Sequence, residues 1–331
     1  MKARRLVSRD KARIEVEEYE LPALGEHDVL VRNEYTAVSV GTEIYCWLHG
    51  AEPGHEPHFP RLTGYCGMGV VVDRGRGVQE VAVGDRVATQ GCHASHQVMD
   101  RYYHRLPEAV AGDEGVFLVM AAIAIRGVRR GRVSLGEGVV VLGVGIVGQL
   151  ALSLCRLSGA LPLIAVDIDR ARLNRAVKRG ADLAVDAGND DEVVRQVQQA
   201  CARDGAEVVL ESTGKPVVYP LAARLACTGG RVVALGSPRG TVEMDFMRDV
   251  HLREVDLIGA FQPLTPEAQH VYYAWTKDRD RRLLLELMAR GSLPARDLIT
   301  HRFVPEQCQQ AYEMLAHRPQ EALGVVFAWD S

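Results

Sequence analysis

The decapeptide VVVLGVGIVG, residues 139–148, decides the fold of this 331-residue chain. Its first four residues form a continuous apolar run, which is typical of a strand buried on both faces. The glycines that follow have the spacing GxGxxG, and the apolar pattern from Ile146 to Leu157 predicts a helix directly after the strand. Gly143 permits a tight turn, Gly145 lets a pyrophosphate approach the backbone, and Gly148 allows close packing of helix on strand. The decapeptide therefore predicts a dinucleotide site at a helix N-terminus.

The alternation of strand and helix continues beyond this decapeptide. Further strands are predicted by apolar runs at residues 163–166, 183–185, 208–210, 232–235 and 257–260. Helices are predicted between them at residues 170–179, 191–203 and 217–227. This regular order implies a parallel, doubly wound sheet, so we expect a Rossmann domain over residues 119–262 of an α/β protein.

The remainder of the chain has a different pattern of apolar residues. Short apolar runs at 29–31 and 69–72, punctuated by Gly, Pro and Asp, predict β structure in residues 1–118. The apolar residues 116–130 predict a helix that leads into the Rossmann domain. Residues 263–331 contain two helical stretches and a last apolar strand, so we treat them as a third segment.

An acidic residue closes the second strand of the dinucleotide-binding unit. Asp167 lies 19 residues after Gly148, where a carboxylate can accept hydrogen bonds from both ribose hydroxyls and repel a 2′-phosphate. This position favours NAD as the cofactor. Arg170 and Arg172 lie nearby and keep NADP open as an alternative, because an arginine can accommodate the 2′-phosphate.

Composition excludes several classes of partner. The formal net charge is −4 and the pI is about 6.3, which do not indicate a nucleic-acid partner. A local arginine cluster at residues 126–132 is interpreted as a solvated helix end. No apolar stretch is long enough to cross a bilayer, and the N-terminus lacks a signal-peptide core. Seven scattered cysteines without a CxxC pair indicate reduced thiols, so we expect a cytoplasmic protein.

Several motifs in register resemble the medium-chain dehydrogenase/reductase superfamily. They are VGTE at 40–43, GYCGMGV at 64–70, GDRV at 84–87, VDID at 166–169, VLESTG at 209–214, GRVVALG at 230–236 and HLREVDLIG at 251–259. The resemblance implies a GroES-like β-barrel catalytic domain at residues 1–118, to which residues 263–331 return. It also implies that the reaction takes place in a cleft between the two domains.

The chain departs from the zinc-dependent members of this superfamily at the metal site. Those members carry Cys where this chain has Val40, and Gly-His-Glu where it has Gly64-Tyr65-Cys66; a third ligand is expected near Val119. Valine cannot coordinate zinc, so we expect no catalytic metal. The tripeptide Gly54-His55-Glu56 lacks the sequence that follows the true ligand motif and is interpreted as a surface loop. An alternative metal site remains open in residues drawn from Cys46, Cys66, Cys92, His93 and His96.

Without zinc, a side chain must handle the proton when hydride moves. By resemblance, Thr42 occupies the relay hydroxyl position and Tyr45 the relay histidine position, so Tyr45 is our first candidate for the acid and base. Tyr65 and His93 are further candidates, His58 is a weaker one, and Glu43 is assigned a structural role. The expected cofactor-binding residues are Gly143, Gly145, Ile146, Val147, Gly148, Asp167, Ile168, Arg172, Ser212, Thr213, Gly214, Leu235, Gly236, Ser237 and Ala260.

The main hypothesis for function is NAD-dependent interconversion of a secondary alcohol and a ketone without zinc. The small-molecule substrate is a polyol, cyclitol, sugar-like compound or hydroxyethyl group, and VGTE also resembles the bacteriochlorophyllide hydroxyethyl dehydrogenase branch. Two alternatives are a zinc-free quinone or enone reductase and a non-enzymatic binding protein on the same fold. The apolar segment 257–261 is interpreted as an exposed edge strand, which predicts a homodimer or a dimer of dimers.

Overall fold

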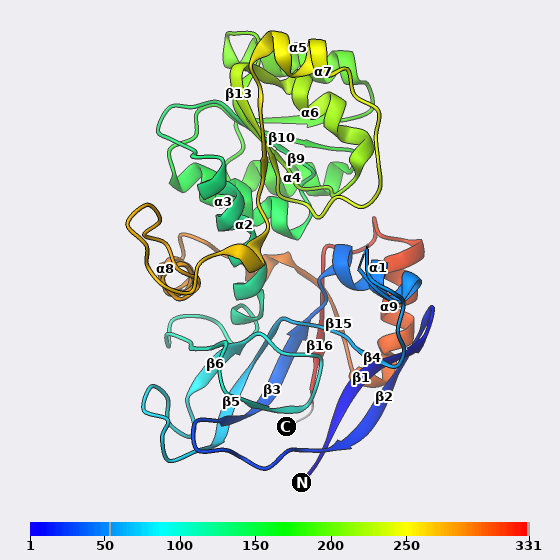
Figure 1. The fold of residues 1–331 in the computed structure, drawn as a ribbon, viewed down its shortest axis with the longest axis vertical. Coiled ribbons are helices and arrows are strands. Elements are labelled where there is room, and N and C mark those ends of the chain that lie inside the picture. The colour runs from blue at the N-terminus through cyan, green and yellow to red at the C-terminus, as the bar shows by residue number, and fades with distance from the viewer. Residues whose placement is uncertain (53, 330–331) are drawn as a thin grey trace. The chain divides into compact units, whose positions relative to one another are not determined.

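The computed structural model describes residues 1–52 and 54–329 and divides into two compact units (Figure 1). The first unit contains residues up to Val119 and the chain from Arg281 onward, and the second contains Met120–Asp280. Among the described residues, no helix is both long and apolar enough to span a membrane.

The second unit is built on a six-stranded parallel sheet. Its strands are β9 (Val139–Leu142), β10 (Leu163–Asp167), β11 (Leu183–Asp186), β12 (Ala206–Glu211), β13 (Ala226–Ala234) and β14 (Asp256–Gly259). Their order is β11-β10-β9-β12-β13-β14, with β9 central and β14 at one edge. All four residues of β9 are buried, as the continuous apolar run predicts. The doubly wound parallel sheet is therefore confirmed.

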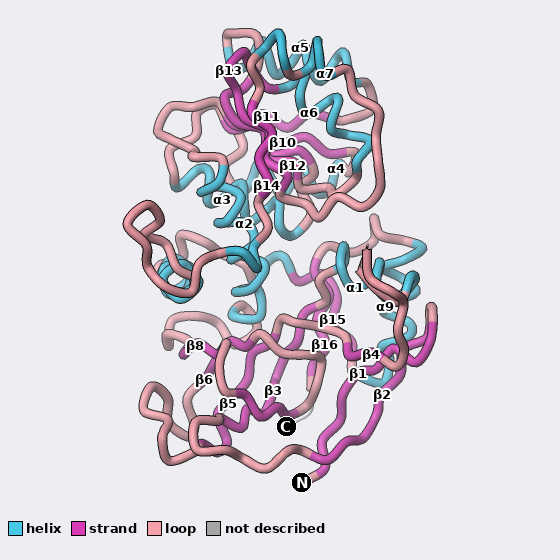
Figure 2. Tube along the Cα trace, in the orientation of Figure 1, coloured by secondary structure: helices cyan, strands magenta, loops and turns pink. Residues whose placement is uncertain are grey.

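Helices connect these strands and flank the sheet, as Figure 2 shows. They are α3 (Ile146–Leu157), α4 (Arg170–Lys178), α5 (Asp190–Cys201), α6 (Tyr219–Leu225) and the short α7 (Phe246–Asp249). Contacts join α3 to α4 and α5 to α6, as expected for two helix layers on opposite faces of a doubly wound sheet. Helix α6 ends two residues before the predicted helix, because Ala226 pairs with Ala206 at the start of β13.

The first unit is rich in β structure, as the sequence predicts. One sheet has the order β15-β16-β3-β5-β6-β8, with β7 also paired to β3, and a second has the order β2-β1-β4. The strands are β1 (Lys2–Asp10), β2 (Arg13–Glu20), β3 (Val29–Ala37), β4 (Arg61–Leu62), β5 (Gly67–Arg74), β6 (Arg86–Thr89), β7 (His96–Met99), β8 (Tyr103–Arg105), β15 (Ile299–Phe303) and β16 (Gly324–Ala328).

Two helices of the first unit bear on the candidate site. They are α1 (Val40–His49) and α9 (Cys308–His317), which pack together through Trp47 and Tyr312 with ring centroids 5.7 Å apart in an edge-to-face arrangement. Helix α1 lies in the part of the sequence that we interpreted as β structure. It ends at Gly50, which has φ +85° and caps the helix by donating to the carbonyl of Cys46.

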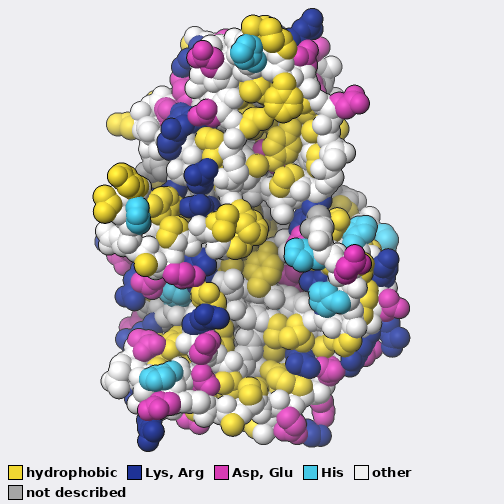
Figure 3. Space-filling model, in the orientation of Figure 1, with side chains coloured by type: hydrophobic (Ala, Val, Ile, Leu, Met, Phe, Trp, Pro, Cys, Tyr) yellow, Lys and Arg dark blue, Asp and Glu magenta, His cyan; other side chains and the backbone are white. Residues whose placement is uncertain are grey.

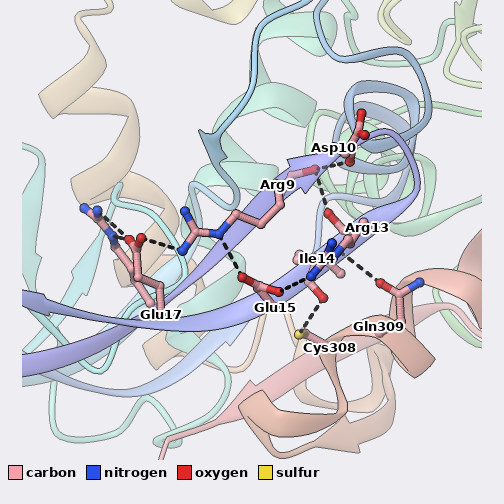
Figure 4. A network of polar contacts seen from close by, with 10 residues as sticks. Arg9, Asp10, Arg13, Ile14, Glu15, Glu17, Cys308 and Gln309 are labelled. Carbon is pink, nitrogen blue, oxygen red and sulfur yellow. Dashed lines mark hydrogen bonds and ion pairs between the residues drawn. The ribbon is translucent and has the colours of Figure 1, made fainter.

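Helix α9 is fixed against the β1–β2 hairpin by hydrogen bonds to backbone groups of the hairpin (Figure 4). The side chain of Gln309 accepts a hydrogen bond from the backbone N–H of Ile14 at 3.0 Å and donates to the carbonyl of Ala12 at 3.0 Å. The thiol of Cys308 donates to the carbonyl of Ile14 at 3.6 Å. Helix α9 is thereby attached to the hairpin on one side and packs against α1 on another.

The boundary after the Rossmann domain differs from the predicted one. We expected the return segment to begin at residue 263, whereas the second unit extends to Asp280. The second unit extends further because two arginines of α2 (Leu118–Arg130) bind residues beyond 262. Arg126 donates to the hydroxyl of Tyr273 at 2.6 Å, and Arg129 pairs with Asp280 at 2.8 Å. Arg129 also stacks on the ring of Trp275. The boundary at Asp280 falls within α8 (Lys277–Ala289).

Candidate functional site

The glycine motif forms a turn at the carboxyl edge of the parallel sheet. Gly143 has φ +86°, and a Cβ there would lie 2.5 Å from the side chain of Thr213. A Cβ at Gly148 would lie 2.1 Å from the carbonyl oxygen of Gly143, so α3 packs against the turn as only glycine allows. A Cβ at Gly145, by contrast, would meet no atom within 4 Å. Gly145 therefore leaves open space in front of the N-terminus of α3, where a pyrophosphate fits.

Other residues that the sequence analysis assigns to the cofactor follow the carboxyl ends of neighbouring strands. They are Asp167 and Ile168 at β10, Ser212, Thr213 and Gly214 at β12, Leu235, Gly236 and Ser237 at β13, and Ala260 at β14. Ile146 and Val147 open α3, and Arg172 lies in the first turn of α4. Because the strands are parallel, these residues gather at one edge of the sheet, which is where ligands bind in open α/β sheets.

The carboxylate of Asp167 is buried and fixed by two backbone amides. It accepts hydrogen bonds from the N–H of Val144 at 2.7 Å and from the N–H of Asp169 at 2.9 Å. Each carboxylate oxygen retains a further acceptor position. Asp167 can therefore accept ribose hydroxyls while it holds the glycine turn.

The two arginines beyond β10 both face carboxylates. Arg170 lies 3.8 Å from Asp186, and Arg172 lies 3.7 Å from Asp169. The backbone carbonyl of Arg172 also accepts a hydrogen bond from Gln149 of α3. Ile168, between Asp167 and these arginines, is 72% exposed, so an apolar surface borders the acidic position.

Glu211, which the sequence analysis did not single out, organises the segment after β12. Its Oε1 atom accepts hydrogen bonds from the N–H of Thr213 at 2.6 Å and of Gly214 at 3.2 Å. Its backbone carbonyl accepts from the N–H groups of Leu235 and Gly236. Burial raises the pKa of the Glu211 carboxyl, and the hydrogen bonds from Thr213 and Gly214 oppose that rise. One acid therefore holds the segments after β12 and β13, both of which contain expected cofactor-binding residues.

In the first unit, α1 presents three candidate side chains on one face. Thr42 and Tyr45 are three residues apart, and His49 follows Tyr45 by four, so the three lie on successive turns. The rings of Tyr45 and His49 are in contact, with centroids 4.3 Å apart. His49 was not identified from the sequence, although its i+4 spacing from Tyr45 would have indicated it once α1 was known to be a helix.

Tyr65 lies opposite the N-terminus of α1. Its phenol forms a hydrogen bond with the hydroxyl of Ser39, the residue that precedes α1, and another with the side chain of Thr42. Burial raises the pKa of Tyr65 above its usual range, so the phenol stays protonated near neutral pH. The structure thus brings Thr42 and Tyr65 together, and it adds Ser39, which the sequence analysis missed.

His93 belongs to a buried polar cluster and has no exposed surface. Its Nε2 lies 2.9 Å from Oε2 of Glu43, and the same oxygen accepts a hydrogen bond from the hydroxyl of Tyr312 at 2.6 Å. The other oxygen of Glu43 accepts from the N–H of Ser39 at 2.7 Å. The position of Glu43 agrees with the structural role we assigned to it. His58, the weaker candidate, lies exposed in the loop after α1 together with His55, and Figure 3 shows histidines on this face of the unit.

At the family's metal-ligand positions the two valines have no donor atom and Cys66 is the one thiol, so the usual ligand set is incomplete. Val40 and Val119 are aliphatic, and the phenol of Tyr65 is engaged by Ser39. In residues 1–52 and 54–329, no three His, Cys, Asp or Glu side chains are arranged to hold a metal ion. Of the alternative ligands, Cys46 contacts Glu52 at 3.6 Å and His93 faces Glu43. The described residues thus do not fit a zinc ion.

Comparison with known protein families finds two adjacent matches. Residues 25–145 match the alcohol dehydrogenase GroES-like domain, and residues 147–276 match the family described as zinc-binding dehydrogenase. The first region runs from the β-rich part through α2 and β9, and the second contains the other five strands of the parallel sheet. Together the two regions cover most of the chain.

Curated relatives match along most of their length. Sorbitol dehydrogenase of Mus musculus is 26% identical, over 91% of this chain and 89% of the relative. A probable D-xylulose reductase A of Aspergillus clavatus is 27% identical, over 91% and 90%. Among solved structures, an Escherichia coli oxidoreductase/dehydrogenase of unknown specificity superposes with a TM-score of 0.88 at 21% identity, over 100% of both chains. That similarity supports the same α/β architecture, a GroES-like domain joined to a Rossmann domain.

Proposed function

The chain belongs to the medium-chain dehydrogenase/reductase superfamily, and we propose that it is an NAD-dependent polyol dehydrogenase that works without catalytic zinc. It would oxidise a secondary alcohol of a polyol or a sugar-like compound to a ketone. The names of the relatives, sorbitol dehydrogenase and D-xylulose reductase, support an oxidoreductase acting on such compounds.

The observation that carries the proposal is the cluster of hydroxyl groups at the start of α1, formed by Ser39, Thr42 and Tyr65. Tyr65, in place of a ligand histidine, shares hydrogen bonds with Ser39 and Thr42, and Val40 stands in place of a ligand cysteine. Hydroxyl groups can both donate and accept, which suits an alcohol substrate. We assign the proton transfer to Tyr45, with Thr42 and Tyr65 binding the substrate oxygen.

The preference for NAD rests on the second unit. The fixed carboxylate of Asp167 provides acceptors for two ribose hydroxyls and disfavours a 2′-phosphate. Arg170 and Arg172, the candidates for binding that phosphate, face Asp186 and Asp169 instead. When bound, NAD would supply hydride chemistry through its nicotinamide, and Gly145, Thr213 and Ala260 belong to the set of residues that we propose holds NAD.

No disulfide joins the cysteines of the described residues, and we accordingly place the proposed enzyme in the cytoplasm. The direct experiment is to incubate the purified, chelator-treated protein with NAD and a panel of polyols, and to measure formation of reduced nicotinamide. We expect turnover with at least one polyol and a lower kcat/KM with NADP. Turnover of quinones or enones with NADPH, without oxidation of any alcohol, would replace this proposal with the reductase alternative.

A further inference from the structure

The hydroxyl of Ser39 has a role other than capping the helix that follows it. Ser39 occupies the N-cap position of α1, where a serine side chain ordinarily accepts a hydrogen bond from the second or third N–H of the helix. No such bond is present at Ser39. Its hydroxyl contacts the phenol of Tyr65 instead.

Glu43 holds the backbone of Ser39 in place. Its carboxylate accepts the N–H of Ser39 at 2.7 Å, which resembles the reciprocal half of a capping box displaced by one residue. The other oxygen of this buried carboxylate accepts from Tyr312 of α9 and lies against His93. The backbone of Ser39 is therefore fixed from two other parts of the unit.

His93 also constrains the segment that precedes Tyr65, the other residue of the Ser39–Tyr65 contact. The N–H of His93 donates to the carbonyl of Thr63 at 2.8 Å. Gly64 has φ +86°, and a Cβ there would lie 2.6 Å from Cγ of His93. The segment that leads into Tyr65 thus lies directly against the His93 ring, so Ser39 and Tyr65 meet in a single arrangement.

The direction of the hydrogen bond follows from acidity. A phenol is a stronger acid than an aliphatic alcohol, so Tyr65 donates and Ser39 accepts. The phenolic proton of Tyr65 is therefore engaged by Ser39, and its hydrogen bond with Thr42 is one in which Thr42 donates. One acceptor position of the phenolic oxygen remains for the substrate.

We propose that Ser39 is a positioning residue that occupies the phenolic proton of Tyr65, so that Tyr65 accepts a hydrogen bond from an alcohol hydroxyl in preference to donating one to a ketone carbonyl. This inference deepens the proposed function and rests on it. It makes Ser39 a determinant of which oxidation state of the substrate binds better.

The test is Ser39→Ala, with the Michaelis constants measured for a polyol and for its ketone. Loss of the Ser39 acceptor releases the phenolic proton, which can then be donated to a carbonyl while Thr42 continues to donate to the phenolic oxygen. We expect the ratio of KM for the alcohol to KM for the ketone to rise at least about fivefold, the effect of one ordinary hydrogen bond. Since the hydroxyl does not cap α1, the melting temperature should stay close to that of the parent. Ser39→Thr retains a hydroxyl and should restore the ratio.

Two further variants make the result specific. Ser95→Ala is the matched control, because the buried hydroxyl of Ser95 accepts the N–H of Arg4 at 2.9 Å in the same unit. It should leave the ratio of Michaelis constants unchanged. In a Tyr65→Phe background, Ser39→Ala should have no further effect on that ratio. A shift that persists in this background, or no shift in the single variant, overturns the inference.

A second measurement separates this inference from the proposed function. If the parent oxidises no alcohol, the proposed function fails, and hydrogen exchange of the ligand-free protein still tests the contact. We expect Ser39→Ala to accelerate amide exchange in residues 39–46 and 63–66, with Ser95→Ala leaving both segments unchanged. Unaltered exchange in both segments would show that Ser39 does not position Tyr65.

Discussion

The carboxylate of Asp167 accepts a hydrogen bond from the backbone N–H of Val144 at 2.7 Å. This contact joins the end of β10 to the middle of the glycine turn, between Gly143 and Gly145. The same side chain that we assign to the ribose thus also shapes the turn that we assign to the pyrophosphate. The two parts of the proposed NAD site are coupled through one buried carboxylate.

Asp167→Ser should narrow or reverse the preference for NAD over NADP. The variant loses the charge that repels a 2′-phosphate and the acceptors for the ribose hydroxyls, so the Kd for NAD should rise at least about tenfold. Dissociation constants for both cofactors, measured by quenching of protein fluorescence, check this expectation. If NADP binds the parent protein more tightly than NAD does, the role of Asp167 is misassigned.

The matched control for this variant is Asp182→Ser. The carboxylate of Asp182 accepts the N–H of Leu163 at 2.7 Å, at the opposite end of β10. It should lower stability without changing the ratio of the two dissociation constants. An equal change in both variants would mean that Asp167 acts on the sheet as a whole rather than on the ribose.

The parallel sheet could be predicted because the local sequence pattern of each strand agrees with its burial in the fold. Apolar runs of four residues each form β9 and most of β10, where the sheet buries both faces, and α3 has the predicted limits, Ile146–Leu157. The glycine motif carries its own geometry, since Gly143 and Gly148 occupy positions that a side chain would block. The carboxyl edge of the sheet could therefore be predicted as the cofactor site from the sequence alone.

The site in the first unit could be predicted only in part. Helix α1 has only ten residues, begins with Val-Gly-Thr and lies between β strands, so its local pattern is weak. It is stabilised by contacts distant in sequence, such as Trp47 with Tyr312 and Glu43 with His93. Without the helix, the shared face of Thr42, Tyr45 and His49 was not visible, and Ser39 gave no signal at all.

The chain should form a homodimer or a dimer of dimers through the edge strand β14. One side of β14 has no neighbouring strand in the sheet order, while Leu257 is 44% exposed and Phe261, just beyond the strand, is 61% exposed. An apolar open edge favours pairing with a second copy. Leu257→Lys should shift the protein toward monomer in sedimentation velocity at micromolar concentration. Val177→Lys, on the exposed side of α4, should leave the assembly unchanged. A monomeric parent protein contradicts the prediction.

Glu211 should make stability depend on pH in a defined direction. Between the pKa of a glutamate in the unfolded chain and the higher pKa of Glu211 in the fold, only the folded protein retains the proton. The free energy of unfolding therefore falls as pH rises through this window and levels off above the folded-state pKa. Glu211→Gln lacks this equilibrium, so its melting temperature relative to the parent should increase with pH.

Thermal unfolding of both proteins over a series of pH values measures this difference. Glu207→Gln is the matched control for loss of a carboxylate from β12, since Glu207 accepts the N–H of Gly138 at 2.7 Å. A melting-temperature difference between Glu211→Gln and the parent that decreases as pH rises would have the wrong sign and would show that the carboxyl is stabilised as an anion.

Chelator treatment should leave activity unchanged. Val40 and Val119 offer no ligand atoms, so elemental analysis should find less than about one zinc per several chains. Purified protein is dialysed against a chelator and assayed with and without added zinc. A stoichiometric metal that is lost together with activity would contradict zinc independence and would direct attention to Cys46, Cys66 and His93.

The last prediction concerns the proton. Tyr45 lies one turn beyond Thr42 on α1, and its ring contacts the exposed His49, whereas the phenol of Tyr65 is engaged by Ser39 and its pKa is raised by burial. Loss of a positioned acid or base typically costs two to four powers of ten in rate. The side chain that exchanges a proton during turnover should therefore be Tyr45.

Tyr45→Phe should lower kcat at least about tenfold and leave the Kd for NAD nearly unchanged, because NAD is assigned to the second unit. Thr42→Ala should have an intermediate effect and Tyr65→Phe a smaller one. The pH profile of kcat should lose one limb in Tyr45→Phe and keep it in Tyr65→Phe, since a phenol that stays protonated does not titrate in the assay range. Tyr103→Phe is the matched control, because its hydroxyl contacts Glu80 in the same unit. If Tyr45→Phe retains full activity and an unaltered profile, Tyr45 only lines the site, and His93 becomes the next candidate to test.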